Sequence, residues 1–339
     1  MSAPLLLTMG DPCGIGPEIV ARASVRGAAA GCVAVGDPGV MRRALQQVDA
    51  SWPLAVLDGP SEIDRCPPRC LPLWVPDGLP AGLADLPLGR VDACAGAAAA
   101  TCIEAAVRAV QRGDAAAIVT APIHKEAFAA AGVPYPGHTE MLAALAGGPP
   151  VRMMLANDEL RVVLATIHVS LRRALDLLDH DTVLDTIRIA ARAAAAWSAG
   201  APRVAVAGLN PQAGEGGLFG DEEIHFIAPA VQAARAEGID ASGPHAPDTV
   251  FMRARQGSFD VVVSMVHDHG LIAVKYLGVE HGVNVTLGLP FVRTSPDHGT
   301  GFDIAGQGVA DPRSLEAAIA MARRMAAAAG ATAGRPAPS

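Results

Sequence analysis

Apolar and polar residues alternate along the chain in two distinct ways. Short runs that are apolar at nearly every position, such as 5–9, 115–120 and 261–266, are typical of strands buried on both faces. Between them lie longer segments with small or apolar residues on one side, such as 92–112, which is typical of an amphipathic helix. This alternation predicts an α/β protein with mostly parallel central sheets.

The same patterns divide most of the remaining chain into strands and helices. The two runs that meet at Asn157-Asp158 predict a hairpin, and the Pro- and Gly-rich stretch 52–90 predicts short strands and loops. Further strands are predicted over 32–35, 151–156, 160–168 and 203–207, and further helices over 19–28, 40–47, 182–199, 222–237 and 315–329, with one more beginning at 141.

Histidines follow two of the predicted strands directly. His168 ends one apolar run, and His267, Asp268 and His269 follow another. In open α/β sheets, ligands bind at the carboxyl ends of the strands. The spacing makes His168 and His267 a candidate pair of ligands for a divalent metal, whereas the alternative is two hydrogen-bonded structural histidines.

Cationic and amide side chains follow further along the chain. Lys275, Asn284 and Arg293 are too widely spaced to share one helix face, so only the fold can bring them together. Lysine and arginine suit an anionic group on a small molecule. The segment 297–300 is either a simple turn or a cofactor contact, and the glycine-rich loop 208–220 is either a phosphate cradle or an ordinary strand-end loop.

Composition and charge narrow the class of protein. The chain has 339 residues, of which 51% are hydrophobic, and this length fits one large or two ordinary globular domains. A net charge of -8 argues against a nucleic-acid binder. No secretory signal is visible, and we expect no membrane span because charged residues break the alanine tracts.

The six cysteines lie in the first third of the chain without the paired spacing of a zinc site. Free thiols in a reducing compartment are the simplest interpretation. We therefore predict a cytoplasmic location.

Several unusual motifs resemble the 4-hydroxythreonine-4-phosphate dehydrogenase family of pyridoxal phosphate biosynthesis. They follow that family's order and are spread over almost the whole chain. The first runs from Gly10-Asp11-Pro12 to Glu18, and the longest from Gly282-Val283-Asn284 to Ser295. The others are Thr120-Ala121-Pro122-Ile123 with Lys125-Glu126, Tyr135-Pro136-Gly137-His138-Thr139-Glu140, Gly208-Leu209-Asn210-Pro211, Ala213-Gly214-Glu215, Pro247-Asp248-Thr249 and His267-Asp268.

The resemblance implies two α/β/α domains with a cleft between them, built like the isocitrate and isopropylmalate dehydrogenases and without a Rossmann fingerprint. It implies NAD-dependent (or NADP-dependent) oxidation of the secondary alcohol in 4-phosphooxy-L-threonine, followed by decarboxylation to 3-amino-2-oxopropyl phosphate. It also implies a homodimer with a shared active site. We expect residues 1–138 and 296–330 to form the first domain, 139–295 to form the second, with the dimer-interface and metal-site residues, and 331–339 to be a flexible tail.

The family's site residues carry over position by position. His138, Thr139, Lys275, Asn284 and Arg293 match its substrate-binding positions. The metal, which is Zn, Mg, Mn or Co, is expected on His168 and His267, with a third ligand that is a histidine in the family and Gln212 here.

His269 is a candidate substitute for the family histidine that Gln212 replaces. A glutamine amide oxygen is a poor substitute for imidazole on zinc but is acceptable to Mg²⁺ or Mn²⁺. The family usually has glutamine where this chain has His269. If the segment is extended, His269 shares a face with His267 and restores a site with three imidazoles. The alternative is a weakened metal site or none.

Three ionisable residues are candidates for the catalytic base, and another group is the candidate cofactor contact. The base candidates are Lys275, Asp248 and Asp268. The candidate cofactor contacts are Thr294, Asp297, His298 and Gly299.

Two alternatives to the vitamin-pathway activity stay open. One is the same chemistry on another anionic substrate, either a phosphorylated four-carbon sugar acid or a carboxylated aromatic cis-dihydrodiol. The other is a metal-free relative that binds an anion without turnover.

Overall fold

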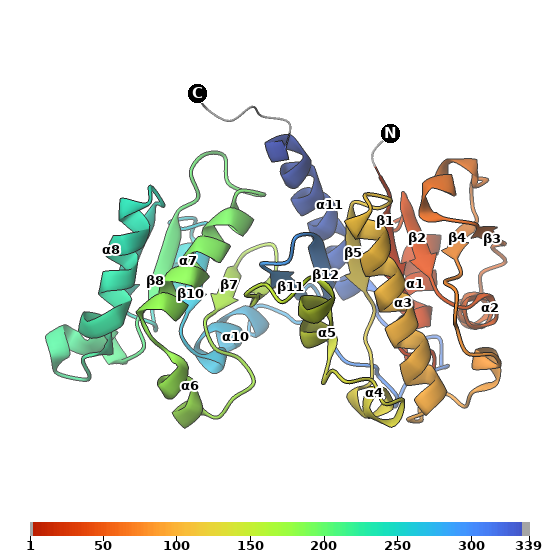
Figure 1. Ribbon diagram of the computed structural model, residues 1–339, viewed down its shortest axis with the longest axis horizontal. Coiled ribbons are helices and arrows are strands. Elements are labelled where there is room, and N and C mark those ends of the chain that lie inside the picture. Colours follow the sequence, from red (N-terminus) through yellow and green to blue (C-terminus); the bar gives the residue numbers. More distant parts are fainter. Residues whose placement is uncertain (1–2, 334–339) are drawn as a thin grey trace. The chain divides into compact units, whose positions relative to one another are not determined.

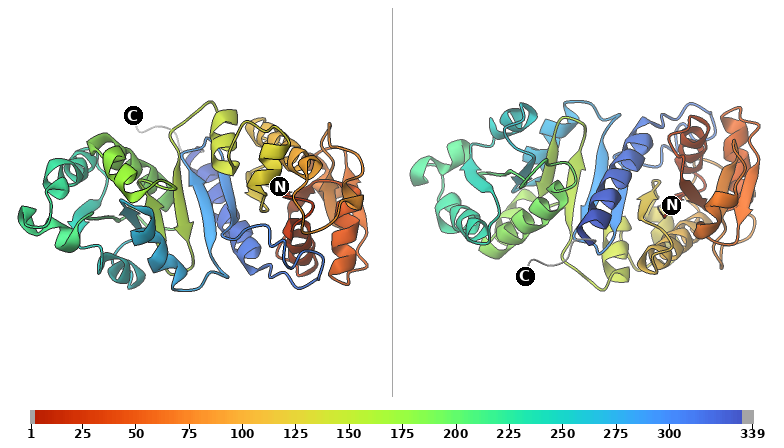
Figure 2. Two further views of the ribbon diagram at one scale, coloured as in Figure 1. Left: turned by 90° about the horizontal axis from the view of Figure 1, so that it is seen from below. Right: turned by 90° about the horizontal axis from the view of Figure 1, so that it is seen from above.

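The computed structural model describes residues 3–333, which form two compact units (Figures 1 and 2). Unit 1 runs to Val151 and resumes over Leu289–Ala326. Unit 2 comprises Arg152–Gly288 and the described residues from Ala327 onward. Both units alternate strands with helices, which confirms the predicted α/β class.

The unit boundaries differ from the predicted domain boundaries at 138/139 and 295/296. Helix α5 (His138–Leu145) and strand β12 (Val292–Pro296) lie in unit 1, whereas the sequence analysis gave nearly all of their residues to the second domain. The chain returns to unit 1 earlier than expected because β12 pairs with a strand of that unit.

Unit 1 is built on six parallel strands in the order β3-β4-β2-β1-β5-β12. All four residues of β1, β2 and β5 are buried, as expected for strands covered on both faces. The bounds not yet given are β1 (Leu5–Thr8), β2 (Cys32–Val35), β3 (Leu54–Leu57), β4 (Leu71–Trp74) and β5 (Ala117–Thr120).

The main helices of unit 1 start at residues that the sequence marks as caps. The Asp37 carboxylate accepts the N–H of Val40 at 2.8 Å, and Asp92 accepts that of Cys94 at 2.7 Å. These residues precede α2 (Pro38–Gln47) and α3 (Ala93–Gln111). The other helices that begin in unit 1 are α1 (Gly16–Val25), α4 (Lys125–Ala130) and α11 (Arg313–Ala333), with 3₁₀ turns η1 (Pro60–Arg65) and η2 (Leu83–Asp85).

Unit 2 contains a mixed six-stranded sheet in the order β11-β6-β7-β10-β8-β9. Strand β6 runs antiparallel to both neighbours, and its pairing with β7 confirms the predicted hairpin at Asn157. The remaining pairs are parallel. The bounds are β6 (Arg152–Ala156), β7 (Arg161–Leu164), β8 (Val204–Ala207), β9 (Ala241–His245), β10 (Val261–Ser264) and β11 (Val283–Leu287).

Helices cover both faces of this sheet. Val162, Leu164 and Val262 form one core cluster with residues of α9 (Val250–Arg255) and α10 (His267–Lys275). Since side chains alternate along a strand, the other face meets α7, which packs on β10 and β8. The remaining helices are α6 (Leu171–Leu177), α7 (His180–Ala194) and α8 (Ala228–Ala236), with η3 (Pro211–Gly217) and the π-helical turn η4 (Glu223–Ile227).

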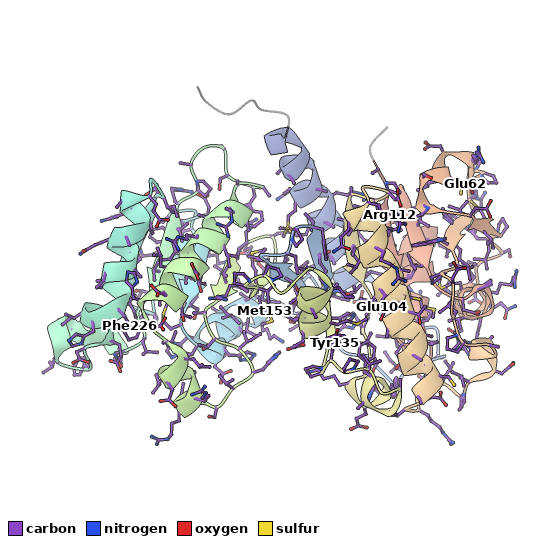
Figure 3. The ribbon with its side chains drawn as sticks, viewed as in Figure 1. Glu62, Glu104, Arg112, Tyr135, Met153 and Phe226 are labelled. Carbon is purple, nitrogen blue, oxygen red and sulfur yellow. The ribbon has the colours of Figure 1, made fainter. Side chains whose placement is uncertain are left out.

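Helix α3 contradicts the expectation that no apolar run is long enough to span a bilayer. Its mean hydropathy is 1.4, and by length and composition it could cross a membrane. The charges Glu104 and Arg108 are too few to break the run (Figure 3 labels Glu104). However, 61% of the apolar window is buried inside the protein, as in the core helix of a globular domain.

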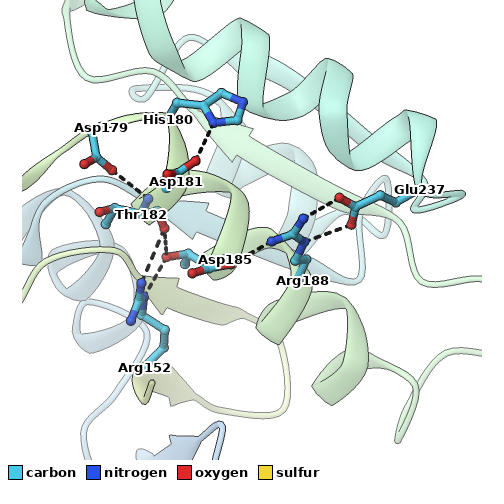
Figure 4. Close-up of polar contacts among 9 residues, drawn as sticks. Arg152, Asp179, His180, Asp181, Thr182, Asp185, Arg188 and Glu237 are labelled. Carbon is cyan, nitrogen blue, oxygen red and sulfur yellow. Dashed lines mark hydrogen bonds and ion pairs between the residues drawn. The ribbon is translucent and has the colours of Figure 1, made fainter. Parts of the chain in front are cut away.

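Helix α7 is fixed at its start and along its exposed side (Figure 4). The Asp179 carboxylate caps it by accepting the N–H of Thr182 at 2.7 Å. The Arg188 guanidinium donates both to Asp185, one turn earlier, and to Glu237 at the end of α8. These contacts tie two helices of unit 2 together at their surface.

Several shorter elements escaped the sequence analysis. Residues 243–249 were expected to be a loop, but β9 extends to His245. The strand predicted to end at His168 stops at Leu164. The expected tail 331–339 begins with helix, because α11 continues to Ala333, and residues 334–339 lie outside the described part of the chain.

Gly96 offers a test of the packing of α3. A Cβ at Gly96 would overlap the carbonyl of Ala127 in α4, whereas a Cβ at Gly330 in α11 meets nothing within 4 Å. We expect Gly96→Ala to lower the free energy of unfolding by about 3 kcal/mol. Gly330→Ala should raise it by roughly 0.5 kcal/mol, since alanine favours helix. Urea denaturation of both variants checks this, and equal stabilities would contradict the packing.

Candidate functional site

Two imidazoles meet at the ends of neighbouring strands in unit 2. His168 follows β7 and His267 follows β10, and these parallel strands are in register at Leu164 and Ser264. The two ring centres are 5.8 Å apart, with the ring planes inclined by 47°. The structure thus brings together the two histidines that the sequence singled out.

Buried hydrogen bonds hold the two loops that carry these rings. The hydroxyl of Thr166 donates to the carbonyl of Met265 at 2.8 Å, and the N–H of Ala165 donates to the carbonyl of Ser264 at 2.9 Å. His168 itself has a left-handed backbone, with φ of 44°. A non-glycine residue adopts this conformation only where its surroundings impose it.

Asp268 lies beside one of the two rings. Its carboxylate is 2.7 Å from Nδ1 of His267. In the tautomer whose Nδ1–H donates a hydrogen bond to this carboxylate, Nε2 of His267 keeps its lone pair for a ligand. This geometry suits Asp268 to orienting His267, which is an alternative to the role of catalytic base considered from the sequence.

The proposed compensation by His269 rests on a wrong assumption about local structure. Helix α10 begins at His267, so the segment is helical and not extended. Side chains at positions i and i+2 of a helix point roughly 200° apart around its axis, so His267 and His269 do not share a face. Across the described part of the chain, no group of three or more His, Cys, Asp or Glu residues is placed to hold a metal ion.

Gln212 lies in an unusual loop of unit 2. The five residues Gln212–Gly216 in η3 all have positive φ, and three of them are not glycine. Left-handed backbone costs about 1 to 2 kcal/mol for each such residue. Gln212 is exposed.

The other candidates of unit 2 are distributed over separate elements. Lys275 is the exposed last residue of α10, and Asp248 is exposed in the turn before α9. Asn284 is half-buried in β11, where its Nδ2 lies 3.2 Å from Sδ of Met153 in β6, which Figure 3 labels.

Unit 1 contains a buried guanidinium. Arg293 in β12 is 3% exposed, and its Nη2 and Nε donate to the hydroxyl of Thr120, at the end of β5, at 2.6 and 3.2 Å. Burial lowers the pKa of Arg293 to about 9. Holding a guanidinium away from water costs free energy, and an anionic ligand would recover part of it.

Burial and the charge of Arg293 also affect His138. It is the first residue of α5, followed by the half-buried Thr139, and its Nε2 is enclosed and has no hydrogen-bond partner among residues 3–333. Burial, and then the charge of Arg293, hold the pKa of His138 well below its usual value. The ring is therefore neutral at pH 7 and can donate from one nitrogen and accept at the other.

A buried carboxylate lies in the loop after β1. Asp11 is 1% exposed and accepts the N–H of Cys13 at 2.8 Å. Burial raises its pKa to about 6, against the opposing effect of that hydrogen bond and of nearby His124. Strands β1 and β5 are adjacent and parallel, so this loop lies beside the one after Thr120. A carboxyl with so altered a pKa at a strand end is a functional candidate.

The candidate cofactor contacts differ in how accessible they are. Thr294 is fully buried and its hydroxyl donates to the carbonyl of Ala318, which favours a packing role. Asp297 and His298 are half-buried, and Gly299 is exposed, in the turn after β12.

Two threonines were missed by the sequence analysis. Thr120 receives the guanidinium of Arg293, and Thr166 fixes the loop of His168. Each is a polar residue at or just beyond the end of a buried apolar strand. A polar residue in that position is a signal for a strand-end site in these threonines as much as in the histidines.

Comparisons with known proteins match residues of both units to one family. The family model described as "Pyridoxal phosphate biosynthetic protein PdxA" matches residues 28–322. A 4-hydroxythreonine-4-phosphate dehydrogenase of Beijerinckia indica is 54% identical over 324 residues, which are 95% of each chain. A D-threonate 4-phosphate dehydrogenase of Pectobacterium atrosepticum is 44% identical over 96% of this chain and 100% of its own length.

A solved structure of a protein with the same name as the Beijerinckia indica relative is also similar to this chain. The crystal structure of a 4-hydroxythreonine-4-phosphate dehydrogenase from Klebsiella pneumoniae aligns with a TM-score of 0.87 and 44% identity, covering 96% of this chain and 98% of that one. The chain belongs to the PdxA family.

Membership in the PdxA family makes the chain an enzyme of the dehydrogenase type, and such an enzyme uses NAD or NADP. The matched residues include His138 and Arg293 of unit 1 and His168 and His267 of unit 2. The roles of these individual residues remain predictions.

Asp11 allows a test of the buried loop in unit 1. We expect Asp11→Asn to raise the free energy of unfolding by about 3 kcal/mol at pH 8, where the native carboxylate is ionised without water. The gain should shrink as the pH falls through 6 toward 4. Over that range the folded carboxyl is already protonated, whereas the unfolded one is protonated only near 3.8. Urea denaturation across this pH range checks the trend, and a constant gain would contradict the raised pKa.

Proposed function

We propose that this enzyme oxidises the secondary alcohol of 4-phosphooxy-L-threonine, and that the keto acid then loses carbon dioxide to give 3-amino-2-oxopropyl phosphate. The observation that carries the proposal is the 54% identity, over 95% of both chains, with a relative named for the 4-hydroxythreonine-4-phosphate activity. The side chains grouped within each unit are consistent with it.

Unit 1 supplies the contacts for the anionic end of the substrate. Arg293 offers a planar fork of donors that suits phosphate or carboxylate. The neutral ring of His138, followed by the hydroxyl of Thr139, adds hydrogen bonds without adding a second positive charge. Asn284 of unit 2 contributes an amide that can donate to the substrate or accept from it.

Unit 2 supplies the contacts for the alcohol. Two imidazoles bound to one tetrahedral ion at about 2 Å have ring centres roughly 5 to 6 Å apart, and the 5.8 Å between His168 and His267 fits this. With the amide oxygen of Gln212 as a third ligand, the set is poorer for zinc than three imidazoles and is acceptable to Mg²⁺ or Mn²⁺. A divalent ion there would supply Lewis-acid chemistry to the alcohol and later to the decarboxylation.

Proton transfer and hydride transfer complete the reaction. When bound, NAD or NADP would supply the acceptor for the hydride of the alcohol carbon. Lys275 and Asp248 are the candidates for holding the hydroxyl proton, and both are exposed, so the proton can pass on to water. Asp268 keeps the His267 ring in its orientation. Asp297, His298 and Gly299 remain the candidate cofactor contacts.

D-threonate 4-phosphate is the second candidate substrate. A relative named for it covers this chain with 44% identity. By their names the two substrates share the phosphate at C4 and differ at C2, beside the carboxylate, which carries an amine in one and a hydroxyl in the other. Arg293 would bind the phosphate of both, so other residues must discriminate between them.

We expect the purified protein to form NADH from 4-phosphooxy-L-threonine, with loss of the activity after chelation and recovery with Mg²⁺, Mn²⁺ or Co²⁺. Arg293→Lys should raise KM for this substrate at least about tenfold, since lysine lacks the fork. Arg188→Lys, on an exposed face of α7, is the matched control. Turnover of D-threonate 4-phosphate alone would favour the second substrate, and binding without NADH formation would overturn both.

We also propose that the enzyme is a cytoplasmic homodimer. Its six cysteines are free thiols, which supports a reducing compartment. Large apolar side chains are exposed on three segments of unit 2, which supports a second copy of the chain as partner. They are Leu171 and Leu175 on α6, Ile272 and Tyr276 on and just after α10, and Leu218, Phe219 and Ile224 around η3 and η4.

Light scattering tests the dimer. We expect Tyr276→Asp and Leu218→Asp to shift the protein toward the monomer mass, because a buried carboxylate without a partner opposes association. Val56→Asp places the same charge at an exposed apolar position of unit 1 and should leave the mass unchanged. A monomeric wild-type protein at micromolar concentration would contradict the proposal.

A further inference from the structure

A buried carboxylate lies under the loop that carries Gln212. Glu223, the first residue of η4, is 3% exposed. Its Oε1 accepts the N–H groups of Leu209 and Asn210, each at 2.7 Å, and its Oε2 accepts the side-chain amide of Asn210 at 2.9 Å. The carboxylate therefore binds the backbone immediately before the loop.

Two glycines make room for this carboxylate. A Cβ at Gly208 would lie 3.0 Å from Oε1 of Glu223, and a Cβ at Gly214 would lie 2.8 Å from Oε2. Gly214 also has a φ of 79°. Glu223 thus contacts the loop before Gln212, through Leu209 and Asn210, and after it, through Gly214.

The loop needs such support. Gln212, Ala213 and Glu215 are held in left-handed backbone conformations that these residue types disfavour. The conformation persists only where surrounding contacts determine it. Glu223 supplies charged hydrogen bonds at the point where the chain enters this conformation.

We propose that Glu223 is the positioning residue that holds the 208–216 loop and so fixes the amide of Gln212 toward the alcohol end of the substrate. The part that concerns Gln212 rests on the proposed function. Glu223 touches neither substrate nor cofactor in this role. Its neighbour Glu222 accepts the side-chain amide of Asn210 at 2.7 Å, and among residues 3–333 its carboxylate has no hydrogen bond to the backbone of the 208–216 loop.

A pair of glycine variants separates crowding at Gly214 from backbone strain. Gly214→Ala and Gly216→Ala both place alanine at positive φ, but only the first crowds its surroundings. A Cβ at Gly214 would lie 2.8 Å from Oε2 of Glu223 and 2.9 Å from the carbonyl oxygen of Gly220, whereas a Cβ at Gly216 meets nothing within 4 Å. We expect the amides of residues 209–216 to exchange hydrogen at least tenfold faster in Gly214→Ala. Gly216→Ala should change their exchange less than threefold, and strand β10 should stay protected in both.

Glu223→Gln and Glu222→Gln provide the second pair. In Glu223→Gln the new side-chain amide would turn an N–H group toward a donor of Asn210 or Leu209, so the same amides should exchange faster, whereas Glu222→Gln should match the wild type. In NADH assays we expect kcat of Glu223→Gln to fall at least tenfold with KM for NAD unchanged. A general loss of folding would instead lower the thermal midpoint and the protection of β10.

The outcomes separate this inference from the proposed function. Wild-type exchange of residues 209–216 in both Glu223→Gln and Gly214→Ala would overturn the role of Glu223, whatever the substrate. Faster exchange with kcat unchanged would overturn the link to Gln212. If the wild-type protein oxidises neither phosphorylated substrate, the proposed function fails, while the exchange experiment still tests the loop.

Discussion

The register between neighbouring parallel strands is the constraint on which the candidate site depends. Because β7 and β10 end level, His168 and His267 leave the sheet of unit 2 side by side. In unit 1 the pairing of β5 with β12 puts Thr120 within reach of Arg293. A shift of one residue in the β5–β12 pairing would turn Arg293 to the opposite face of the sheet from Thr120. Strand pairing thus sets where each group of residues begins, and the hydrogen-bonded loops after β7 and β10 carry the two imidazoles.

The sequence predicted those parts of the fold that repeat a simple pattern. The buried strands β1, β5 and β10, the long helix α3 and the hairpin at Asn157 were found because apolar runs and turn residues mark them. Strands β9, β11 and β12 were missed because glycine, proline or polar residues interrupt them. Their pairing with neighbouring strands outweighs their weak local preference.

The site was predictable to a similar degree. Strand ends identified His168 and His267, because the carboxyl ends of strands are where α/β proteins bind ligands. The error over His269 has a local cause, since the start of α10 could not be distinguished from a continued strand. Thr120 and Glu223 were missed because their roles depend on partners 173 and 13 or 14 positions away in the chain.

The carboxylate of Glu223 fills space that a side chain at Gly208 or Gly214 would need. A substitution at any one of these three positions therefore disturbs the others. A larger residue at Gly208 would also meet Ala213, one at Gly214 would also meet the carbonyl of Gly220, and a shorter acid at 223 would abandon the amides of Leu209 and Asn210. Any single substitution at these three positions removes a contact or creates a clash. We therefore expect the residue at 212 to vary more readily than the loop that holds it.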